Sequence, residues 1–248
     1  VAPFKDTPEG QEAEAIVRKC VHCGFCLATC PTYQLLGDEL DSPRGRIYLM
    51  KQVLEGEPVT ARTQLHLDRC LTCRNCETTC PSGVEYGRLV DIGRGLVEKR
   101  VPRSFAEQMK RKALSAVVPK ANVFSPLLKL GQLARPVLPA AMQQKLPSAA
   151  AVSAGDSNWP AARHARKMLV LEGCVQPALA PSINAATARL LDRCGISLIK
   201  AEQASCCGAL DYHLSRHAGG MDYMRRNIGA WWPHIEAGAE AIVITASG

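Results

Sequence analysis

The sequence contains few aromatic residues and no long apolar run. Aromatic residues make up 5% of the 248 positions, so an apolar core has to be built from Leu, Val, Ile and Ala. No stretch of about 18 consecutive apolar residues is present, and residues 1–16 are acidic, without the basic start and apolar run of a secretory signal. These absences exclude a membrane-spanning helix and a secretory signal within this sequence.

The sequence also lacks the motifs that bind nucleotides or activate a serine nucleophile. G-x-G-x-x-G, G-x4-G-K-[ST] and G-x-S-x-G are all missing, and Gly93 and Gly95 lie within a helical pattern. We therefore expect no site for a nicotinamide, flavin or nucleotide, and no catalytic residue, in this chain.

Cysteine, by contrast, is abundant, with 12 residues. A chain of this length can build a core without disulfides, and no N-x-[ST] glycosylation site is present, so metal binding is favoured over a disulfide framework. The first eight cysteines form two runs, residues 20–30 and 70–80, that are copies at a constant offset of 50. The same offset relates Thr29 to Thr79, which indicates an internal duplication.

Each run has the pattern C-x2-C-x2-C-x3-C-P, which is typical of two-cluster ferredoxins, where the fourth cysteine of one run ligates the cluster of the other. This rule assigns one [4Fe-4S] cluster to Cys20, Cys23, Cys26 and Cys80, and the other to Cys70, Cys73, Cys76 and Cys30. Exchange of the fourth ligands makes the clusters neighbours, and neighbouring clusters form an electron relay. The alternative is a pair of structural zinc sites, which usually use two C-x2-C hooks separated by a dozen or more residues.

Charged residues near the two runs have two interpretations. His22, inside the first run, is expected to be an exposed loop residue rather than a donor to cluster sulfur. Several arginines either favour the reduced clusters, by offsetting the added electron, or are solvated surface residues. These arginines are Arg44, Arg46, Arg69, Arg74 and Arg88.

The pattern along the chain predicts three parts. Residues 1–100 read as a mostly helical domain, and residues 101–165, which are rich in Pro with Ala-rich filler at 140–154, as a basic connector of short helices and flexible chain. Residues 166–248 alternate expected strands with helices, which predicts a doubly wound parallel sheet. The strands are expected at 168–171, 196–199 and 241–245, and the helices at 183–194 and 221–232. The sequence opens with Val and stops just after the last expected strand, so we expect a fragment.

The remaining cysteines lie in the third part. Cys174, Cys206 and Cys207 follow the first two expected strands, and ligands of open α/β sheets collect at the carboxyl ends of strands, so these thiols are expected to converge on a third metal site. A further contribution is expected from residues 246–248. Cys194 is expected to be a small buried core residue on its helix.

Other candidate features are weaker. His213 and His217 have i,i+4 spacing but no intervening Glu, so solvated histidines are favoured over metal ligands. The pair Trp231 and Trp232 is expected to pack into a core rather than form a docking patch.

The segment 88–135 carries 11 basic and 3 acidic residues, which accounts for the whole excess in the formal charge of +7. It is interpreted either as a solvated face or as a docking surface for an acidic partner or an anionic membrane. Nucleic acid is disfavoured because only Phe105 and Phe124 offer stacking surfaces there.

The sequence closely resembles the iron-sulfur subunits of glycolate oxidase over essentially its whole length. The resemblance is carried by CVHCGFCLATCPTYQLLGDE (20–39), SPRGRIY (42–48) and LDRCLTCRNCETTCPSGV (67–84) in the first half. In the second half, LEGCVQP (171–177) and CCGAL (206–210) resemble that family's first cysteine-rich CCG domain. No cysteine follows Cys207 here, whereas the family pattern continues to a later cysteine.

The resemblance implies an α+β multidomain protein: an all-α ferredoxin-like domain with two [4Fe-4S] clusters, followed by an incomplete α/β CCG domain with a possible third cluster at Cys174, Cys206 and Cys207. It implies an electron-transfer subunit of an oxidoreductase, cytoplasmic or peripheral on the cytoplasmic face of the inner membrane. Flavin-containing glycolate oxidase subunits would oxidise glycolate to glyoxylate, and this chain would pass the electrons toward a quinone or membrane acceptor. No nucleic-acid partner is implied.

Alternatives stay open within and outside this class. Related iron-sulfur subunits of L-lactate utilisation, anaerobic glycerol-3-phosphate dehydrogenase and heterodisulfide reductase share the two ferredoxin runs and the CCG element. A zinc-stabilised module that uses its basic segment on nucleic acid or an acidic partner is the alternative of a different class. Colour separates these classes, because iron-sulfur clusters absorb visible light and zinc sites do not.

Overall fold

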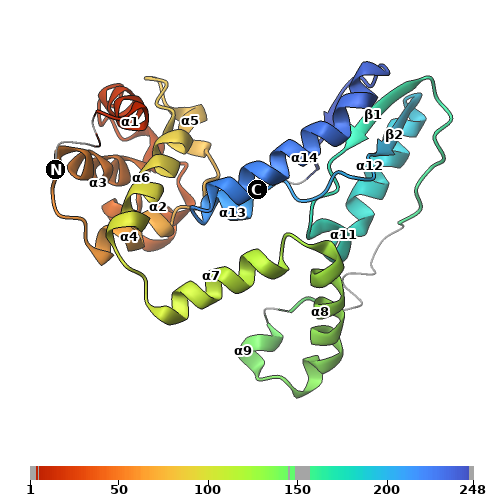
Figure 1. The fold of residues 1–248 in the computed structure, drawn as a ribbon, viewed down its shortest axis with the longest axis horizontal. Helices are drawn as coiled ribbons and strands as arrows, with labels where there is room; N and C mark the ends of the chain where they lie inside the picture. The colour runs from red at the N-terminus through yellow and green to blue at the C-terminus, as the bar shows by residue number, and fades with distance from the viewer. Residues whose placement is uncertain (1–3, 5, 145, 149–156, 246–248) are drawn as a thin grey trace. The chain divides into compact units, whose positions relative to one another are not determined.

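A computed structural model describes residues 4, 6–144, 146–148 and 157–245 of the chain (Figure 1). The chain divides into two compact units, residues 1–105 and residues 106–247, and each is described by itself. Among the described residues, no helix is long and apolar enough to cross a membrane.

The first unit is entirely helical in its described part. Its longer helices are α1 (Pro8–Arg18), α3 (Pro43–Glu55), α4 (Ala61–Asp68) and α6 (Tyr86–Arg100). Short helical turns lie between them: η1 (Phe25–Leu27), α2 (Pro31–Leu36), η2 (Glu39–Asp41) and α5 (Asn75–Thr79). The all-helical first domain is therefore as predicted from the sequence.

Capping side chains begin three of the longer helices. Thr7, Ser42 and Thr60 stand just before α1, α3 and α4. The hydroxyl of each accepts a hydrogen bond from the backbone N–H of the third residue of its helix, at 3.1, 2.9 and 3.3 Å, respectively. Each cap satisfies an otherwise unpaired amide and contributes about 1 kcal/mol to helix stability. Pro at the first helical position of α1 and α3 reinforces the start, because its φ angle already suits a helix.

The core of the first unit lies around α6, which packs against α1, α3 and α4 (Figure 1). Leu89, Val90 and Val97 on α6 are at most 1% exposed, and Met50 of α3 and Leu67 of α4 pack in the same cluster. Burying each such side chain contributes about 1.5–3 kcal/mol. Several cysteines of both runs pack against this cluster, so the core supports the loops that carry the thiols.

The second unit begins with helices and continues with a small parallel sheet. Helices α7 (Phe105–Val117), α8 (Ala121–Ala134), η3 (Arg135–Val137) and α9 (Ala140–Gln143) occupy much of the segment expected to be a connector. Residues 149–156 of that segment lie outside the described residues. The boundaries 100/101 and 165/166 stay predictions.

The sheet has the order β2-β1-β3, with all strands parallel. Its strands are β1 (Arg166–Val170), β2 (Ile196–Lys200) and β3 (Ile242–Val243), connected through α11 (Gln176–Leu179), α12 (Pro181–Arg193), α13 (Ala209–His213) and α14 (His217–Glu236). Leu169 and Val170 of the central strand are at most 1% exposed, and Ala188 of α12 and Leu198 of β2 pack beside Val170. The predicted strand–helix alternation is confirmed, although β3 is shorter than the strand expected at 241–245.

Candidate metal centres

The two cysteine runs begin in the same way, at the end of a helix. α1 ends at Arg18 and α4 ends at Asp68, positions related by the offset of 50. The amide of Cys20 donates to the Val17 carbonyl at 3.0 Å, and the amide of Cys70 donates to the Leu67 carbonyl at 3.2 Å. The first thiol of each run is therefore held by the last turn of a helix that is anchored in the core.

Both runs then adopt the left-handed backbone region at matching positions. His22 and Thr72 have φ angles of 53° and 55°, and Gly24 and Arg74 have φ angles of 88° and 59°. A left-handed conformation costs a residue other than glycine roughly 1–2 kcal/mol. This cost is typical of a functional loop, and here it allows three thiols spaced by two residues to turn toward one side.

A pair of duplicated arginines supports these turns. Arg44 Nη1 donates to the His22 carbonyl at 3.3 Å, and Arg94 Nη1 donates to the Thr72 hydroxyl at 3.0 Å. Arg94 Nη2 also donates to the Cys70 carbonyl at 2.6 Å. The duplication therefore extends from the cysteine runs to the side chains that hold them in place.

Two cavities lie beside the runs, each lined by thiols from both. Cys20, Cys23 and Cys26 of the first run and Cys80 of the second line the first cavity, of about 420 Å³. The second cavity, of about 300 Å³, is lined by Cys70, Cys73 and Cys76 of the second run and Cys30 of the first. Cys76, Pro43 and Tyr86 line both cavities, so the two share a wall.

The thiols are too far apart for one small ion. Among the described residues, the only three His, Cys, Asp or Glu ligand atoms that lie within 4.8 Å of one another belong to Asp38, Asp41 and His66. Thiolates around a tetrahedral zinc, each about 2.3 Å from the metal, would be about 3.8 Å apart. Wider spacing around a cavity fits a multi-atom group with sulfur ligands, and a [4Fe-4S] cluster has these properties.

Asp38, Asp41 and His66 do not themselves form a metal site. The fully buried Asp41 carboxylate accepts from Arg69 Nη1 at 2.7 Å, from Arg46 Nη2 at 3.4 Å and lies 3.1 Å from His66 Nδ1. Two guanidinium groups on one carboxylate repel a further cation. We interpret this group as a buried ion-pair network.

Burial makes the free thiols of Cys76 and Cys26 hold their protons. The pKa of Cys76 is raised to about 12, first by burial and then by the neighbouring thiols of Cys70 and Cys26. Burial also raises the pKa of Cys26, although a hydrogen bond from the Arg44 backbone N–H lowers it in part. Metal ligation needs thiolates, so binding at these cavities releases protons.

The third cysteine set also comes together, at the carboxyl edge of the sheet as predicted. Cys174 follows β1, and Cys206 and Cys207 follow β2. The Cys206 thiol donates to Cys174, which lowers the pKa of Cys174 to about 7 and raises the pKa of Cys206. The Cys207 thiol donates to Cys206, which raises the pKa of Cys207. The further contribution expected from residues 246–248 lies outside the described residues.

Gly208 and Asn227 hold this loop. Gly208 has a φ angle of 86°, and a Cβ at this position would overlap the Gly220 carbonyl of α14, so only glycine fits. The side chain of Asn227 is 3% exposed and bonds the backbone of both Ser205 and Cys206. The Cys-Cys-Gly sequence is therefore positioned by α14.

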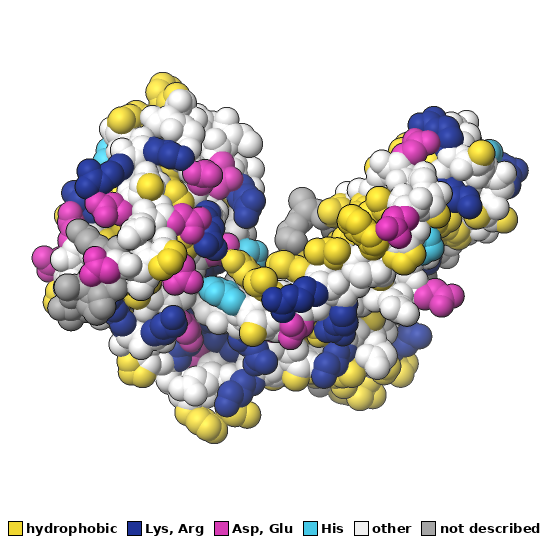
Figure 2. All heavy atoms as spheres, turned by 45° about the horizontal axis from the view of Figure 1, so that its top comes forward, with side chains coloured by type: hydrophobic (Ala, Val, Ile, Leu, Met, Phe, Trp, Pro, Cys, Tyr) yellow, Lys and Arg dark blue, Asp and Glu magenta, His cyan; other side chains and the backbone are white. Residues whose placement is uncertain are grey.

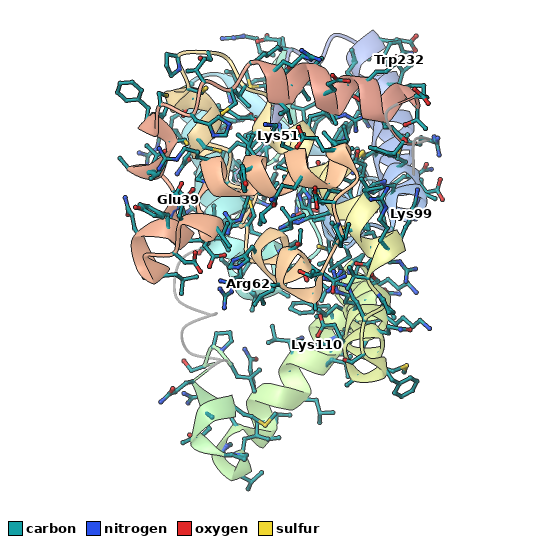
Figure 3. All side chains as sticks on the ribbon, turned by 90° about the vertical axis from the view of Figure 1, so that its left-hand side faces the viewer. Glu39, Lys51, Arg62, Lys99, Lys110 and Trp232 are labelled. Carbon is teal, nitrogen blue, oxygen red and sulfur yellow. The ribbon has the colours of Figure 1, made fainter. Side chains whose placement is uncertain are left out.

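Two expectations for the second unit are wrong. Cys194 is exposed, not buried, because α12 ends at Arg193 and Cys194 is the C-cap, beyond the packed face of the helix. Trp232 is 55% exposed on α14, with its indole N–H donating to Glu236 Oε1 at 2.9 Å, rather than packed in a core (Figure 3). Trp231 is half-buried.

The structure confirms the expected exposure of His22 and rules out one of the two interpretations of Arg46. His22 is exposed, as predicted, and His217 stacks on Tyr212 with ring centroids 4.5 Å apart. Arg44 and Arg88 pair with Glu39 and Glu12, each at 2.7 Å. Arg46, however, is 1% exposed and is not a solvated surface residue.

Comparison with protein families matches both parts of the chain. Residues 16–84 match the 4Fe-4S dicluster domain, and residues 168–248 match the cysteine-rich domain. The chain joins a 4Fe-4S dicluster domain to a cysteine-rich domain. The dicluster domain contains the first two cysteine runs and both cavities, and the cysteine-rich domain contains the third set.

The chain is similar to several curated proteins. The chain is 62% identical to the glycolate oxidase iron-sulfur subunit of Escherichia coli K12 over 96% of this chain and 58% of that protein. It is 31% identical to a probable glycolate oxidase iron-sulfur subunit of Bacillus subtilis 168, over 95% of this chain and 58% of that protein. A succinate dehydrogenase iron-sulfur subunit of Paracoccus denitrificans is 27% identical over 29% of this chain and 30% of that protein. The chain thus spans about 58% of the length of the glycolate oxidase relatives, and no solved structure matches it.

Two residues around the dicluster domain's second cavity contact sulfur and were not singled out from the sequence. Tyr86 Oη lies 3.5 Å from Cys70 Sγ, and Thr32 Oγ1 lies 3.2 Å from Cys30 Sγ. The Thr32 hydroxyl also accepts from Nη1 and Nη2 of Arg46, each at 3.1 Å. Thr32 directly follows the C-P pair of the first run, so its place in the sequence could have indicated a contact to sulfur. Tyr86 lies at the start of α6, and nothing next to it in the sequence indicates such a contact.

Proposed function

We propose that this chain is an electron-transfer subunit that holds two neighbouring [4Fe-4S] clusters in its dicluster domain. The observation that carries this proposal is the pair of cavities, each lined by the first three thiols of one run and the fourth thiol of the other, with Cys76 lining both. Such clusters accept and release one electron without a change in ligands. The chain's own contribution is to hold the thiols, to bury them against the core and to bring the two sites side by side.

The proposed ligands follow from the lining of the cavities. Cys20, Cys23, Cys26 and Cys80 would hold one cluster, and Cys70, Cys73, Cys76 and Cys30 the other. Cys76 lines both cavities, so lining alone assigns it to neither, and the duplication places it with Cys70 and Cys73 as Cys26 is placed with Cys20 and Cys23.

The cysteine-rich domain is proposed as a third, separate site. Cys174, Cys206 and Cys207 supply three thiols at one edge of the sheet, and the hydrogen bonds between them show that they lie close together. Three thiols with a further donor would suit an iron-sulfur cluster, and we propose that role for them.

The substrate and partners follow from the relatives. We propose that the chain works within a glycolate oxidase or dehydrogenase complex, in which a flavin-containing subunit oxidises glycolate to glyoxylate. The chain would carry the electrons onward to a quinone or membrane acceptor, in the cytoplasm or at the cytoplasmic face of the inner membrane. The sequence itself contains no nucleotide-binding motif, which is consistent with substrate oxidation in another subunit.

The deciding experiment measures iron, acid-labile sulfide and zinc per chain after anaerobic purification, with an electron paramagnetic resonance (EPR) spectrum of the reduced protein. About eight irons and eight sulfides would support the two-cluster relay, and about twelve of each would mean that the third site is also occupied. Zinc without sulfide would reject electron transfer and support the zinc-stabilised module instead.

A second experiment tests the partner and substrate. The chain, copurified with its flavin-containing partners, should be reduced by glycolate, as followed by bleaching of the visible cluster absorption. Reduction by L-lactate or glycerol 3-phosphate but not by glycolate would assign the chain to one of the related complexes instead.

A further inference from the structure

The two cavities of the dicluster domain differ in the groups that face their thiols. Within the described residues, a side-chain hydroxyl contacts a thiol in two places, and both lie at the second cavity. Thr32 contacts Cys30, and Tyr86 contacts Cys70. The offset of 50 that relates the runs places Ser82 opposite Thr32 but Leu36, which has no hydroxyl and is 52% exposed, opposite Tyr86. The duplication therefore provides an internal comparison between the two sites.

The Tyr86 hydroxyl is a permanent donor. Tyr86 is 3% exposed, and a phenolic hydroxyl has an ordinary pKa of about 10, so the group keeps its proton at neutral pH. A cysteine that ligates iron is a thiolate and only accepts hydrogen bonds. The Tyr86 O–H, 3.5 Å from Cys70 Sγ, is then oriented toward a negatively charged sulfur.

The Thr32 hydroxyl can also donate to a ligand sulfur, because its oxygen already accepts from Arg46. Two N–H groups of Arg46 donate to the Thr32 oxygen, so the hydroxyl hydrogen is free to donate to Cys30 Sγ at 3.2 Å or to the Asp41 carbonyl at 2.9 Å. A thiolate at Cys30 would be the more strongly attracting acceptor, because hydrogen bonds to an ionised acceptor are about twice as strong as neutral ones.

The charges around the cavities differ as well. At the second cavity, Arg46 is 1% exposed, and its counter-ion Asp41 is shared with Arg69, so the three groups together carry one net positive charge. Glu77, which faces Cys76, is half-buried and accepts from the Gly87 N–H. Arg74, which lines the same cavity, also lies beside Gly87, so these two opposite charges offset each other. At the first cavity, Arg44 pairs one-to-one with Glu39, and both side chains are partly exposed, so their charges cancel and are screened by water.

Hydrogen bonds to the sulfurs and nearby positive charge both stabilise a cluster's reduced form, which has one more negative charge than the oxidised form. We propose that Tyr86, Thr32 and Arg46 make the cluster ligated by Cys70, Cys73, Cys76 and Cys30 the easier of the two to reduce. Tyr86 and Thr32 are thus positioning residues that set the direction of electron flow, from the first site to the second. One electron leaves the first cluster and one enters the second, with no proton or co-reactant needed. This inference rests on the proposed two-cluster function.

The test is an anaerobic redox titration of the holoprotein, followed by EPR, on the wild type, Tyr86→Phe and Thr32→Val. Cys23→Ser and Cys73→Ser, at matching positions of the runs, identify which signal belongs to which cluster. Tyr48→Phe, 49% exposed, and Ser82→Ala, at the position that matches Thr32, serve as controls.

We expect the signal that Cys73→Ser perturbs to have the higher midpoint potential. Tyr86→Phe should lower the equilibrium constant for its reduction roughly threefold to tenfold, where tenfold corresponds to about 59 mV for one electron. Thr32→Val should act in the same direction, and the controls should not. A higher midpoint for the signal that Cys23→Ser perturbs, or unchanged midpoints in both Tyr86→Phe and Thr32→Val, would overturn the inference. Absence of iron and sulfide would instead reject the proposed function itself.

Discussion

Asn227 Nδ2, on α14, donates to the Cys206 carbonyl at 2.9 Å, while Asn227 Oδ1 accepts from the Ser205 N–H, also at 2.9 Å. One buried side-chain amide therefore bonds two backbone groups of the cysteine loop, the Ser205 N–H and the Cys206 carbonyl. It connects the longest described helix of the second unit to the thiols that follow β2. The loop's position depends on a residue about twenty positions further along the chain.

Asn227→Asp is expected to loosen this loop. The carboxylate still accepts from Ser205 but has no proton to donate to the Cys206 carbonyl, and it is buried. The free energy of unfolding should fall by about 1–3 kcal/mol in urea titrations. The buried Cys206 should become accessible to alkylation at the same time. Arg225→Ala, which removes an exposed ion pair with Asp222 on the same helix, should change stability by less than about 1 kcal/mol. Equal effects of the two changes would contradict the role assigned to Asn227.

The proposed crossed ligation predicts opposite effects for Cys80→Ser and Cys30→Ser. Cys80→Ser should damage the cluster held by Cys20, Cys23 and Cys26, and Cys30→Ser should damage the cluster held by the second run. The reason is that each fourth thiol lines the cavity of the other run. EPR spectra of the two reduced variants, compared with Cys23→Ser and Cys73→Ser, provide the measurement. Damage to the cluster of the variant's own run would reverse the proposed assignment.

The thiols of the cysteine-rich domain should differ in their response to pH after metal removal. Because the Cys206 thiol donates to Cys174, the pKa of Cys174 is about 7, and its thiolate fraction rises as pH rises through that value. Alkylation of Cys174 by iodoacetamide, measured by mass spectrometry of its peptide, should therefore reach half its maximal rate near pH 7. Cys206→Ala should shift this midpoint to higher pH, since the donor is lost. A midpoint that does not move in Cys206→Ala would show that another group stabilises the thiolate.

Asp41 stabilises the dicluster domain at all pH values near neutral. Burial opposes ionisation of Asp41, but hydrogen bonds from His66 and Arg69 outweigh it and hold the pKa of the carboxyl below 3.8. A lowered carboxyl pKa contributes stability above the pKa of the unfolded chain, and this stability is lost only as pH falls through the lower folded pKa. Asp41→Asn should therefore lower the free energy of unfolding by about 3–5 kcal/mol, because Arg46 loses its buried counter-charge.

Urea unfolding at several pH values between 5 and 8 checks this. The difference between wild type and Asp41→Asn should stay constant over that range. A difference that declines as pH rises from 5 to 8 would mean that a protonated histidine dominates instead. Asp38→Asn is the matched control, because Asp38 caps η2 and pairs with neither arginine in the network.

The basic segment contains both internally bonded arginines and exposed lysines. Arg88, Arg94, Arg103 and Arg111 bond to groups within the chain. Lys110 (Figure 3) and Lys112 are exposed on α7. Figure 2 shows positive and negative side chains interspersed over the first unit. Replacing Lys110 and Lys112 by Gln should weaken any association with acidic partner subunits or anionic vesicles and reduce its salt dependence, measured by cosedimentation at low and moderate salt. Lys51→Gln is the control, and an unchanged salt dependence in the double variant would leave the segment as a solvated face.

Much of the fold was predictable because its signals are local. Ser42 followed by Pro43 is a local signal for the start of α3, and the apolar spacing around Leu89 is one for α6, since capping and periodicity involve residues within one or two turns. Cys194 was misplaced because periodicity does not show where a helix stops. The exposure of Trp232 depends on what packs against α14, which is not a local property.

The sequence by itself determined the two cysteine runs, their duplication and the expected pairing of thiols across them, because ligand spacing is a property of consecutive residues. Only the tertiary structure brought the Tyr86 hydroxyl to the Cys70 sulfur, the Arg46 guanidinium to the Thr32 hydroxyl and the Asn227 amide to the Cys206 carbonyl. These contacts join residues that are 14 to 21 positions apart. They arise from how helices pack, so two runs that are nearly the same in sequence acquire different surroundings.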